Sequence, residues 1–343
     1  MRSRIPVILG LTAALGVIMA TAVVVSYRER SRPSPLALLQ TDAEKGDADA
    51  QYGLGRTFEK AKGVPQDYAQ ALVWYSKAAE QGNSDAQFSL GLMHEKGRGV
   101  PQDYSQALGW YRKAAEQGDA RAQFNIGTLY EKGHGVTQDS AEATAWFARA
   151  ANRGAARAQL KLGLRYVEGR GVPQDDEQAV MWLRRAAEQG DASTSAQFNL
   201  GLMYESGRGV AKDEAQALQW YRRAAEQGRA EAQNALGRAY AAGRGATKDF
   251  VESARWYREA AEQGDAEGQF NLANIHFLGR GVPQDLIQAH SWANLAAAAA
   301  PADNYAEYAR LKDAIAPKLT PAQLAEAERT AREWSEAFDR RKK

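Results

Sequence analysis

The sequence predicts an all-α protein in which one helix–turn–helix unit occurs seven times over residues 47–297. Tryptophan recurs at a step of 36 residues, with a single step of 38, at Trp74, Trp110, Trp146, Trp182, Trp220, Trp256 and Trp292. An Asp stands seven residues before each of them, and a Gly stands eight residues after six of them. A fixed period of this length marks a repeat array, because each unit needs its neighbours to complete a hydrophobic core.

The second copy indicates how a unit folds. Apolar residues three and four apart predict a first helix from Asp85 to Lys96. Gly97 and Pro101 end it, since Gly adopts the left-handed turn and Pro cannot continue a helix. Asp103 is expected to cap a second helix that carries Trp110. A buried Trp removes about 150–250 Å² from water. A two-helix unit cannot hide that much surface alone, so we expect each hairpin to shelter the indole of its neighbour.

Small residues recur inside the helices. A Gly in a helix costs about 1 kcal/mol relative to Ala, so its recurrence in every first helix implies a packing reason. We expect these glycines, and an Ala four residues after each Trp of the first six copies, to let helices approach closely beside a bulky ring. The glycines are Gly55, Gly91, Gly127, Gly163, Gly201 and Gly237.

Charge is nearly balanced, with 44 basic and 42 acidic residues. One basic ridge recurs on the second helices, at Lys77, Lys113, Arg149, Arg185 and Arg223. We expect it to be neutralised by acids three residues further on, at Glu80, Glu116, Glu188 and Glu226. Nucleic-acid binding needs a concentrated basic face, so we expect no nucleic-acid partner.

Residues 1–30 are predicted to form a membrane anchor. Residues 5–25 carry no charge, and as a helix they would be about 31 Å long, which matches the hydrocarbon core of a bilayer. A cleaved signal peptide is the alternative, although its apolar region is usually shorter. Arginines flank both ends of the run. Their count gives no clear preference for the orientation of the span in the membrane and slightly favours a cytoplasmic C-terminal side.

The two ends of the array are expected to differ from its middle. Residues 31–46 are interpreted as a linker that leads into the array. Residues 298–343 are interpreted as a C-terminal helical cap, with helices over 305–316 and 322–338 and with Thr320 and Pro321 at the start of the second. Within the array, Ser193–Ser195 mark the 38-residue step and are expected to be a loop insertion.

The residues predict no enzyme, no cofactor and no metal site. The sequence holds no Gly-x-Ser-x-Gly, Ser-x-x-Lys or His-Glu-x-x-His motif, and its Gly-Arg-Gly-Val-Pro turns follow helices and lack the residues of a phosphate loop. The four histidines are scattered, and His94 and His276 stand where other copies carry Tyr, so they are expected to pack. No cysteine is present, which excludes disulfides and a lipid attached to Cys.

The string AQFSLGLMHEKGRGVPQDYSQALGWYRKAAEQG, at residues 86–118, resembles the Sel1-like repeat family, a relative of the tetratricopeptide repeats. The resemblance covers residues 47–297. It implies a right-handed superhelical solenoid that takes part in protein–protein interaction, and it does not imply one particular activity.

In related solenoids the first helices line a concave groove, and the resemblance suggests the same here. Residues at matching first-helix positions differ between copies, as a specificity surface requires. Asn can both donate to and accept from an extended peptide, so we predict a peptide or partner helix along this stripe. Our candidates are Ser89, Leu92, Asn125, Thr128, Lys161, Asn199, Arg238, Asn271 and Asn274. The alternative is that Leu92, Leu164 and Leu202 are ordinary packing and the Asn side chains contact no partner.

We therefore expect a membrane-anchored interaction scaffold of the bacterial cell envelope that binds a protein or peptide. The resemblance to exported members favours a single-pass protein of the inner membrane with periplasmic repeats. A periplasmic protein after signal cleavage, or cytoplasmic repeats, are the alternatives. A hydrolase of cell-wall or β-lactam substrates is a second functional alternative, although the relatives with that activity carry cysteine pairs that this chain lacks. An accessory scaffold for polysaccharide export is a third.

Overall fold

A computed structural model describes residues 34–189 and 193–342, and within them every regular element is a helix. No helix in these two ranges combines the length and the apolar character that a membrane crossing requires. The predicted anchor at residues 5–25 lies outside the described residues.

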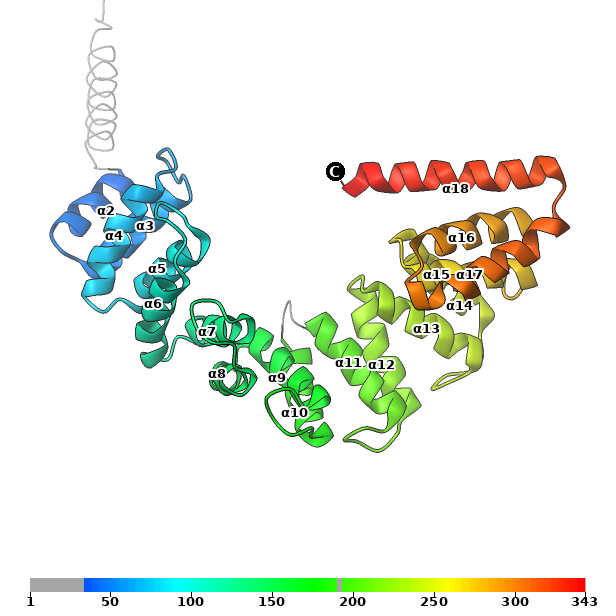
Figure 1. Ribbon diagram of the computed structural model, residues 1–343, viewed down its shortest axis with the longest axis horizontal. Helices are drawn as coiled ribbons and strands as arrows, with labels where there is room; N and C mark the ends of the chain where they lie inside the picture. Colours follow the sequence, from blue (N-terminus) through cyan, green and yellow to red (C-terminus); the bar gives the residue numbers. More distant parts are fainter. Residues whose placement is uncertain (1–33, 190–192, 343) are drawn as a thin grey trace, which may run out of the picture. The chain divides into compact units, whose positions relative to one another are not determined.

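Each repeat contributes two helices of similar length, as the periodicity predicts (Figure 1). The first helices are α3 (Ala48–Glu59), α5 (Ser84–Lys96), α7 (Ala120–Lys132), α9 (Ala156–Glu168), α11 (Ser193–Ser206), α13 (Ala230–Ala242) and α15 (Ala266–Leu278). The second helices are α4 (Tyr68–Glu80), α6 (Tyr104–Glu116), α8 (Ser140–Asn152), α10 (Asp176–Ala187), α12 (Glu214–Glu226), α14 (Phe250–Glu262) and α16 (Leu286–Ala299).

The described helices form two compact units, divided after Gln138. The first unit begins with α2 (Pro35–Glu44), which packs on α3, and extends to α7. The second unit begins at Asp139 and ends with α17 (Ala302–Ile315), the short 3₁₀ helix η1 (Ala316–Lys318) and α18 (Pro321–Lys342). Within each unit, successive helices pack against each other.

The predicted caps are confirmed. The Asp before each second helix is its N-cap: Asp103 Oδ1, for example, accepts hydrogen bonds from the backbone N–H groups of Ser105 and Gln106. The first helix of the same repeat ends at Gly97, whose φ of 65° lies in the left-handed region. These caps satisfy backbone groups that the helix ends leave without partners, so they fix where each helix begins and ends.

The 38-residue step is accommodated differently from the prediction. Ser193–Ser195 are the first residues of α11, which has 14 residues where most first helices have 13. Ser193–Ser195 are therefore helical, whereas residues 190–192 of the same connection lie outside the described residues.

The helical glycines have the expected packing role, but the ring they approach belongs to the residue after the Trp. A Cβ on Gly55 would lie 2.6 Å from Tyr75, and one on Gly201 would lie 2.5 Å from Tyr221. Tyr75 is completely buried. Where the facing residue is Tyr, the two helices of a hairpin therefore touch at a glycine, because a Cβ there would overlap the ring.

The repeat tryptophans pack at successive boundaries between neighbouring hairpins. Trp220 belongs to the core cluster that contains Leu183 and Leu200, and Trp256 belongs to the cluster that contains Leu236. Each cluster joins the second helix of the preceding repeat to the first helix of the indole's own repeat, so these indoles lie at the boundary between two hairpins. Trp182, Trp220 and Trp256 are buried, whereas the other repeat tryptophans are half-buried. Mutual shelter between neighbouring hairpins is confirmed.

The expected pairing of the basic ridge with glutamates is wrong. No ion pair between described residues joins the ridge to the acids three residues later; instead each cation lies over the indole three residues before it. The distances to the ring centroids are 4.1 Å for Lys77 and Trp74, 4.0 Å for Lys113 and Trp110, 4.2 Å for Arg149 and Trp146, 4.7 Å for Arg185 and Trp182, and 4.5 Å for Arg223 and Trp220. A partly desolvated indole face attracts a cation more strongly than a hydrated carboxylate does.

Buried glutamines join helices within a repeat and also join each repeat to the one before it. Gln87 is buried, and its Nε2 donates to the carbonyl oxygen of Ala79 over 3.1 Å. The Oε1 atom of the same side chain accepts from Gln117 Nε2 over 2.8 Å. The second of these bonds recurs between Gln81 and Gln51, Gln189 and Gln159, Gln227 and Gln197, and Gln263 and Gln233. These bonds satisfy buried amides and hold each first helix in register with its neighbours.

The last two α-helices pack on the final repeat. Ser291 Oγ of α16 donates to the Ala327 carbonyl oxygen of α18 over 3.0 Å, and Ala327 and Ala331 are buried. Thr320 and Gln323 form a reciprocal capping box at the start of α18. Figure 1 shows α18 as one long helix after the last hairpin.

Candidate partner-binding surface

The nine candidate residues all lie on first helices. Arg238 is exposed, and the other eight are half-buried. In the first unit, Ser89 and Leu92 belong to α5 and Asn125 and Thr128 to α7. In the second unit they are Lys161 (α9), Asn199 (α11), Arg238 (α13), and Asn271 and Asn274 (α15). We call these nine positions the first-helix stripe.

Several polar groups of the stripe are already engaged within the protein. Asn199 Nδ2 donates to the Ser195 carbonyl oxygen over 2.8 Å. Asn274 Nδ2 donates to the Phe270 carbonyl oxygen over 3.2 Å. Asn271 Nδ2 donates to Asn234 Oδ1 in the preceding repeat over 2.9 Å. An amide oxygen has two lone pairs, so these residues can still accept hydrogen bonds from a partner.

A second polar feature adjoins the stripe in three repeats. The buried tyrosine after the Trp donates its hydroxyl hydrogen to a glutamate 16 residues earlier. The Oη–Oε2 distances are 2.7 Å for Tyr75 and Glu59, 2.7 Å for Tyr111 and Glu95, and 2.5 Å for Tyr221 and Glu205. Burial, reinforced by the neighbouring carboxylate, raises the pKa of all three hydroxyl groups. These tyrosines remain neutral donors at physiological pH.

The sixth repeat keeps the tyrosine but not the glutamate. Tyr257 is 5% exposed, and the residue 16 positions earlier is Ala241. Ser253 lies one turn before Tyr257, but its fully buried Oγ has no hydrogen-bond partner among the described residues. Burial raises the pKa of Tyr257 to about 12, while the nearby Ser253 hydroxyl and Arg238 act in the opposite direction. The hydroxyl therefore faces a position from which its usual carboxylate acceptor is missing.

A cavity of about 280 Å³ lies at that position, and we call it the α13–α15 cavity. It brings together two members of the first-helix stripe with apolar and aromatic side chains and one cation. Its lining consists of Ala241, Phe250, Tyr257, Asn271, Asn274, Ile275, Leu278 and Arg280. The other seven stripe residues do not line it.

The surroundings of the α13–α15 cavity are basic. The lining includes Arg280 and no acid. The Arg280 guanidinium lies 5.5 Å from the Phe250 ring centroid, and Lys248 Nζ lies 4.9 Å from it. The nearby Glu267 forms an ion pair with Arg238 at 3.2 Å, which offsets its charge. The cavity is therefore suited to a negatively charged group.

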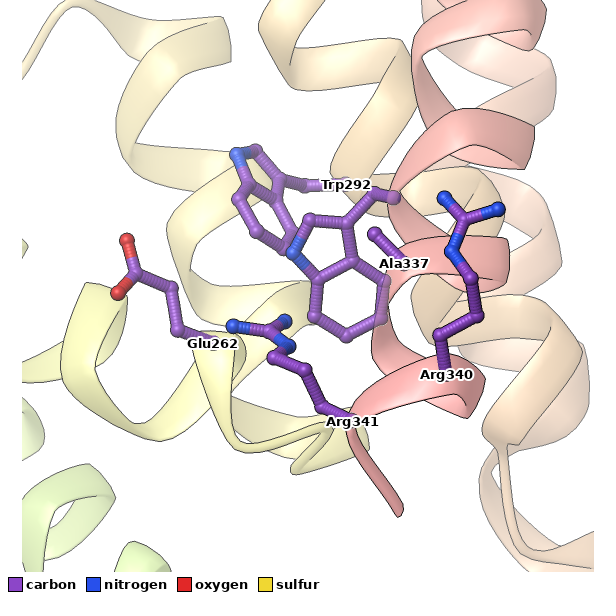
Figure 2. Close-up of a pocket in the computed structure, with 6 residues that line it drawn as sticks. Glu262, Trp292, Ala337, Arg340 and Arg341 are labelled. Atoms are coloured by element: carbon purple, nitrogen blue, oxygen red, sulfur yellow. The ribbon is translucent and has the colours of Figure 1, made fainter. Parts of the chain in front are cut away.

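A larger cavity, of about 620 Å³, lies between α14, α16 and α18. Figure 2 shows Trp292 with Glu262, Ala337, Arg340 and Arg341 around it; Trp334 completes the lining. The Trp292 and Trp334 rings meet edge to face with centroids 5.6 Å apart. In the last repeat Leu295 replaces the ridge cation, and the indole of α18 covers Trp292 instead. This cavity marks the packing of α18 on the array.

The histidines bear out their predicted packing role in part. His276 and His290 are buried, and burial lowers the pKa of both imidazoles. His94 is half-buried. Within the described part of the chain, no three His, Cys, Asp or Glu side chains are grouped so that they could hold a metal ion.

The α13–α15 cavity was not predicted from the sequence, although a signal for it exists. Comparing the tyrosine with the residue 16 positions before it shows Glu in the first, second and fifth repeats and Ala in the sixth. This signal is readable only once the structure shows that the two positions form a hydrogen-bonded pair.

The Sel1 repeat model matches residues 48–83, 84–119, 120–154, 156–191, 194–228, 230–265 and 266–300. A Sel1 repeat protein from Oxalobacter formigenes is 37% identical, with a TM-score of 0.63, over 80% of this chain and 79% of that one. A protective antigen of uropathogenic Escherichia coli strains is 27% identical, with a TM-score of 0.62, over 89% of this chain and 95% of that one. No curated protein sequence matches the chain.

Proposed function

The chain belongs to the Sel1 repeat family, whose members mediate protein–protein interaction, and we propose that it is a non-enzymatic scaffold that binds a peptide or partner protein along the first-helix stripe. The proposal rests on a difference between the positions that build the repeat and the positions of the stripe. The recurring Gly, Tyr, Gln and Trp residues make the packing contacts within and between hairpins, whereas the stripe residues differ from repeat to repeat and are at most half-buried.

The α13–α15 cavity supports partner binding at the first helices rather than at the second helices. It opens beside Asn271 and Asn274, where Leu278 is 48% exposed. The second helices instead present indoles that are buried, covered by cations or, at Trp292, covered by the indole of Trp334. An accessible apolar side chain among convergent polar groups is the usual composition of a binding site.

We test the proposal with a photo-crosslinking amino acid placed at Asn274 in the full chain, in cells. Asn274 is suitable because its side chain bonds only to its own helix. The control position is Glu259, an exposed residue of the second helix α14. We expect discrete crosslinked partners from position 274 and none from position 259. Equal crosslinking from both positions, or none from either, would contradict the proposal.

We propose further that residues 5–25 anchor the scaffold in the bacterial inner membrane, with the repeats in the periplasm. The uncharged run supports the anchor, and 21 residues suffice to span a bilayer. Protease added to spheroplasts should then digest the repeats, while the chain sediments with membranes. Repeats that stay protected until the cells are lysed would place them in the cytoplasm instead.

A further inference from the structure

Three repeats provide a template for carboxylate binding at the tyrosine position. In each, a buried hydroxyl donates to a glutamate oxygen at 2.5–2.7 Å. A hydrogen bond to a charged acceptor contributes more than one between neutral groups, since the ionised oxygen is the stronger acceptor. The hairpin is therefore shaped around a carboxylate at this point.

The sixth repeat retains the donor side of the template. Tyr257 is buried like its counterparts, and the glycine it packs against, Gly237, is also retained. Ala241 provides no oxygen where Glu59, Glu95 and Glu205 provide theirs. The space left by the shorter side chain belongs to the α13–α15 cavity, to which Ala241 and Tyr257 both contribute.

The size and charge of the cavity limit its occupant. About 280 Å³ lies just below the range of ordinary small-molecule sites, so it suits one side chain better than a whole cofactor. Arg280 adds a positive charge, the two asparagines add polar contacts, and Phe250 and Leu278 provide apolar walls for a methylene chain. These features match an acidic side chain with an aliphatic stem.

We propose that the α13–α15 cavity binds a glutamate side chain of the partner, whose carboxylate accepts from the Tyr257 hydroxyl and pairs with Arg280 in place of the glutamate that the sixth repeat lacks. This inference rests on the proposed function and specifies the chemistry of the partner.

The decisive variant is Ala241→Glu, which restores the internal carboxylate. We expect it to fill the cavity and to form the pair seen at Tyr221, so that thermal stability is kept or raised while partner binding is lost. A binding defect in a protein that is at least as stable as the wild type cannot be attributed to misfolding. Tyr257→Phe removes only the hydroxyl group and should weaken binding about tenfold, the usual effect of losing a hydrogen bond to a charged group.

The probe is an N-acetylated, C-amidated alanine-based peptide with one central Glu, titrated into the full chain and followed by NMR of ¹³C-labelled tyrosine. We expect a saturable shift of the Tyr257 resonance, identified from its absence in Tyr257→Phe. A peptide with Gln in place of Glu should give no such shift. A Gln peptide with a free C-terminus tests whether a terminal carboxylate enters instead, and binding of that peptide alone would overturn the assignment to a side chain.

A matched control lies in the fifth repeat. Glu205→Ala removes the hydrogen-bond partner of Tyr221 and should make that tyrosine responsive to the Glu peptide, whereas wild-type Tyr221 should not respond. If Ala241→Glu responds to the peptide like the wild type, the inference is wrong. If crosslinking from position 274 persists undiminished in Ala241→Glu, the inference fails while the proposed function stands. If the peptide binds at Tyr257 but no partner is crosslinked from position 274, the proposed function fails and with it the assignment of the glutamate to a partner, whereas the cavity is still shown to bind a carboxylate.

Discussion

Individual glycines in this array have opposite roles according to what faces them. Gly91 in α5 is buried, and a methyl group there would overlap the Tyr111 ring. Gly109 in α6 is exposed, and an added Cβ would meet nothing within 4 Å. The first is required by packing, whereas the second only weakens its helix.

Substitution by Ala should therefore move stability in opposite directions at the two sites. We expect Gly91→Ala to destabilise the protein by about 1–3 kcal/mol, the usual cost of overpacking a core. Gly109→Ala should stabilise it by about 0.5–1 kcal/mol, because Ala has the higher helix propensity. Urea denaturation followed by circular dichroism measures both. Similar losses at the two sites would show that the contact with Tyr111 does not matter.

Individual residues also show where sequence reasoning reaches its limit. The caps at Asp103 and Gly97 were predictable, because each acts on backbone within a few residues of itself. The position of Lys113 was not, since Trp110 and Glu116 both lie three residues away on the same helix face. Choosing between them needs the burial of the indole, which depends on the neighbouring repeat.

Among the elements, α16 carries the more deeply buried of the two buried histidines. His290 is 3% exposed, and its Nδ1 has no hydrogen-bond partner among the described residues. Burial is the main cause that lowers its pKa; Lys312 lowers it further, while Glu328 and Asp313 act in the opposite direction. Folding thus keeps this imidazole neutral between α16 and the two helices that follow it.

This arrangement should make the C-terminal helices sensitive to acid. Below the ordinary pKa of 6.5, the unfolded chain binds a proton that the folded chain binds only at lower pH, so stability falls as the pH falls. We expect His290→Phe to reduce the loss of stability between about pH 7 and about pH 5. Urea denaturation of both proteins at the two pH values measures it. Burial also lowers the pKa of His276, so part of the loss of stability should remain in the variant. An unchanged loss would exclude a role for His290.

Across the whole molecule, the contacts that hold the repeats together are local. The Gly–Tyr contacts lie within one repeat, and so do the Gln–Gln bonds, which join positions 30 residues apart. The bond from Gln87 Nε2 to the carbonyl oxygen of Ala79 joins consecutive repeats. Stability is then close to a sum of repeat and interface contributions. The α13–α15 cavity is likewise built by consecutive helices.

Removing one complete repeat should therefore preserve the fold. Deletion of residues 84–119, one full period, joins two hairpins with the same complementary faces. We expect a cooperative thermal transition and helix content reduced by about one ninth, because α2, α17 and α18 remain with the other six hairpins. Deletion of residues 84–101 leaves a second helix without its first and should unfold the neighbouring repeats. Equal damage from both deletions would argue that the array is not modular.

How far the sequence predicts the molecule depends on the range of the interaction. The period predicts the seven hairpins and their mutual shelter, because both follow from residues that recur. The candidate site is predicted only in part. Asn271 and Asn274 were recognised as variable first-helix positions, but the cavity beside them depends on Ala241 and Tyr257, which become neighbours only through folding.

The repeat tryptophans also serve as intrinsic fluorescent probes of the boundaries between hairpins. Each repeat tryptophan stands at a boundary between hairpins, so its emission depends on whether that boundary is closed. Because the environments differ, from the buried Trp220 to the half-buried Trp74, the fluorescence of the whole chain averages over distinct signals. Variants that keep a single indole, with Phe at the other positions, would follow the opening of one boundary at a time.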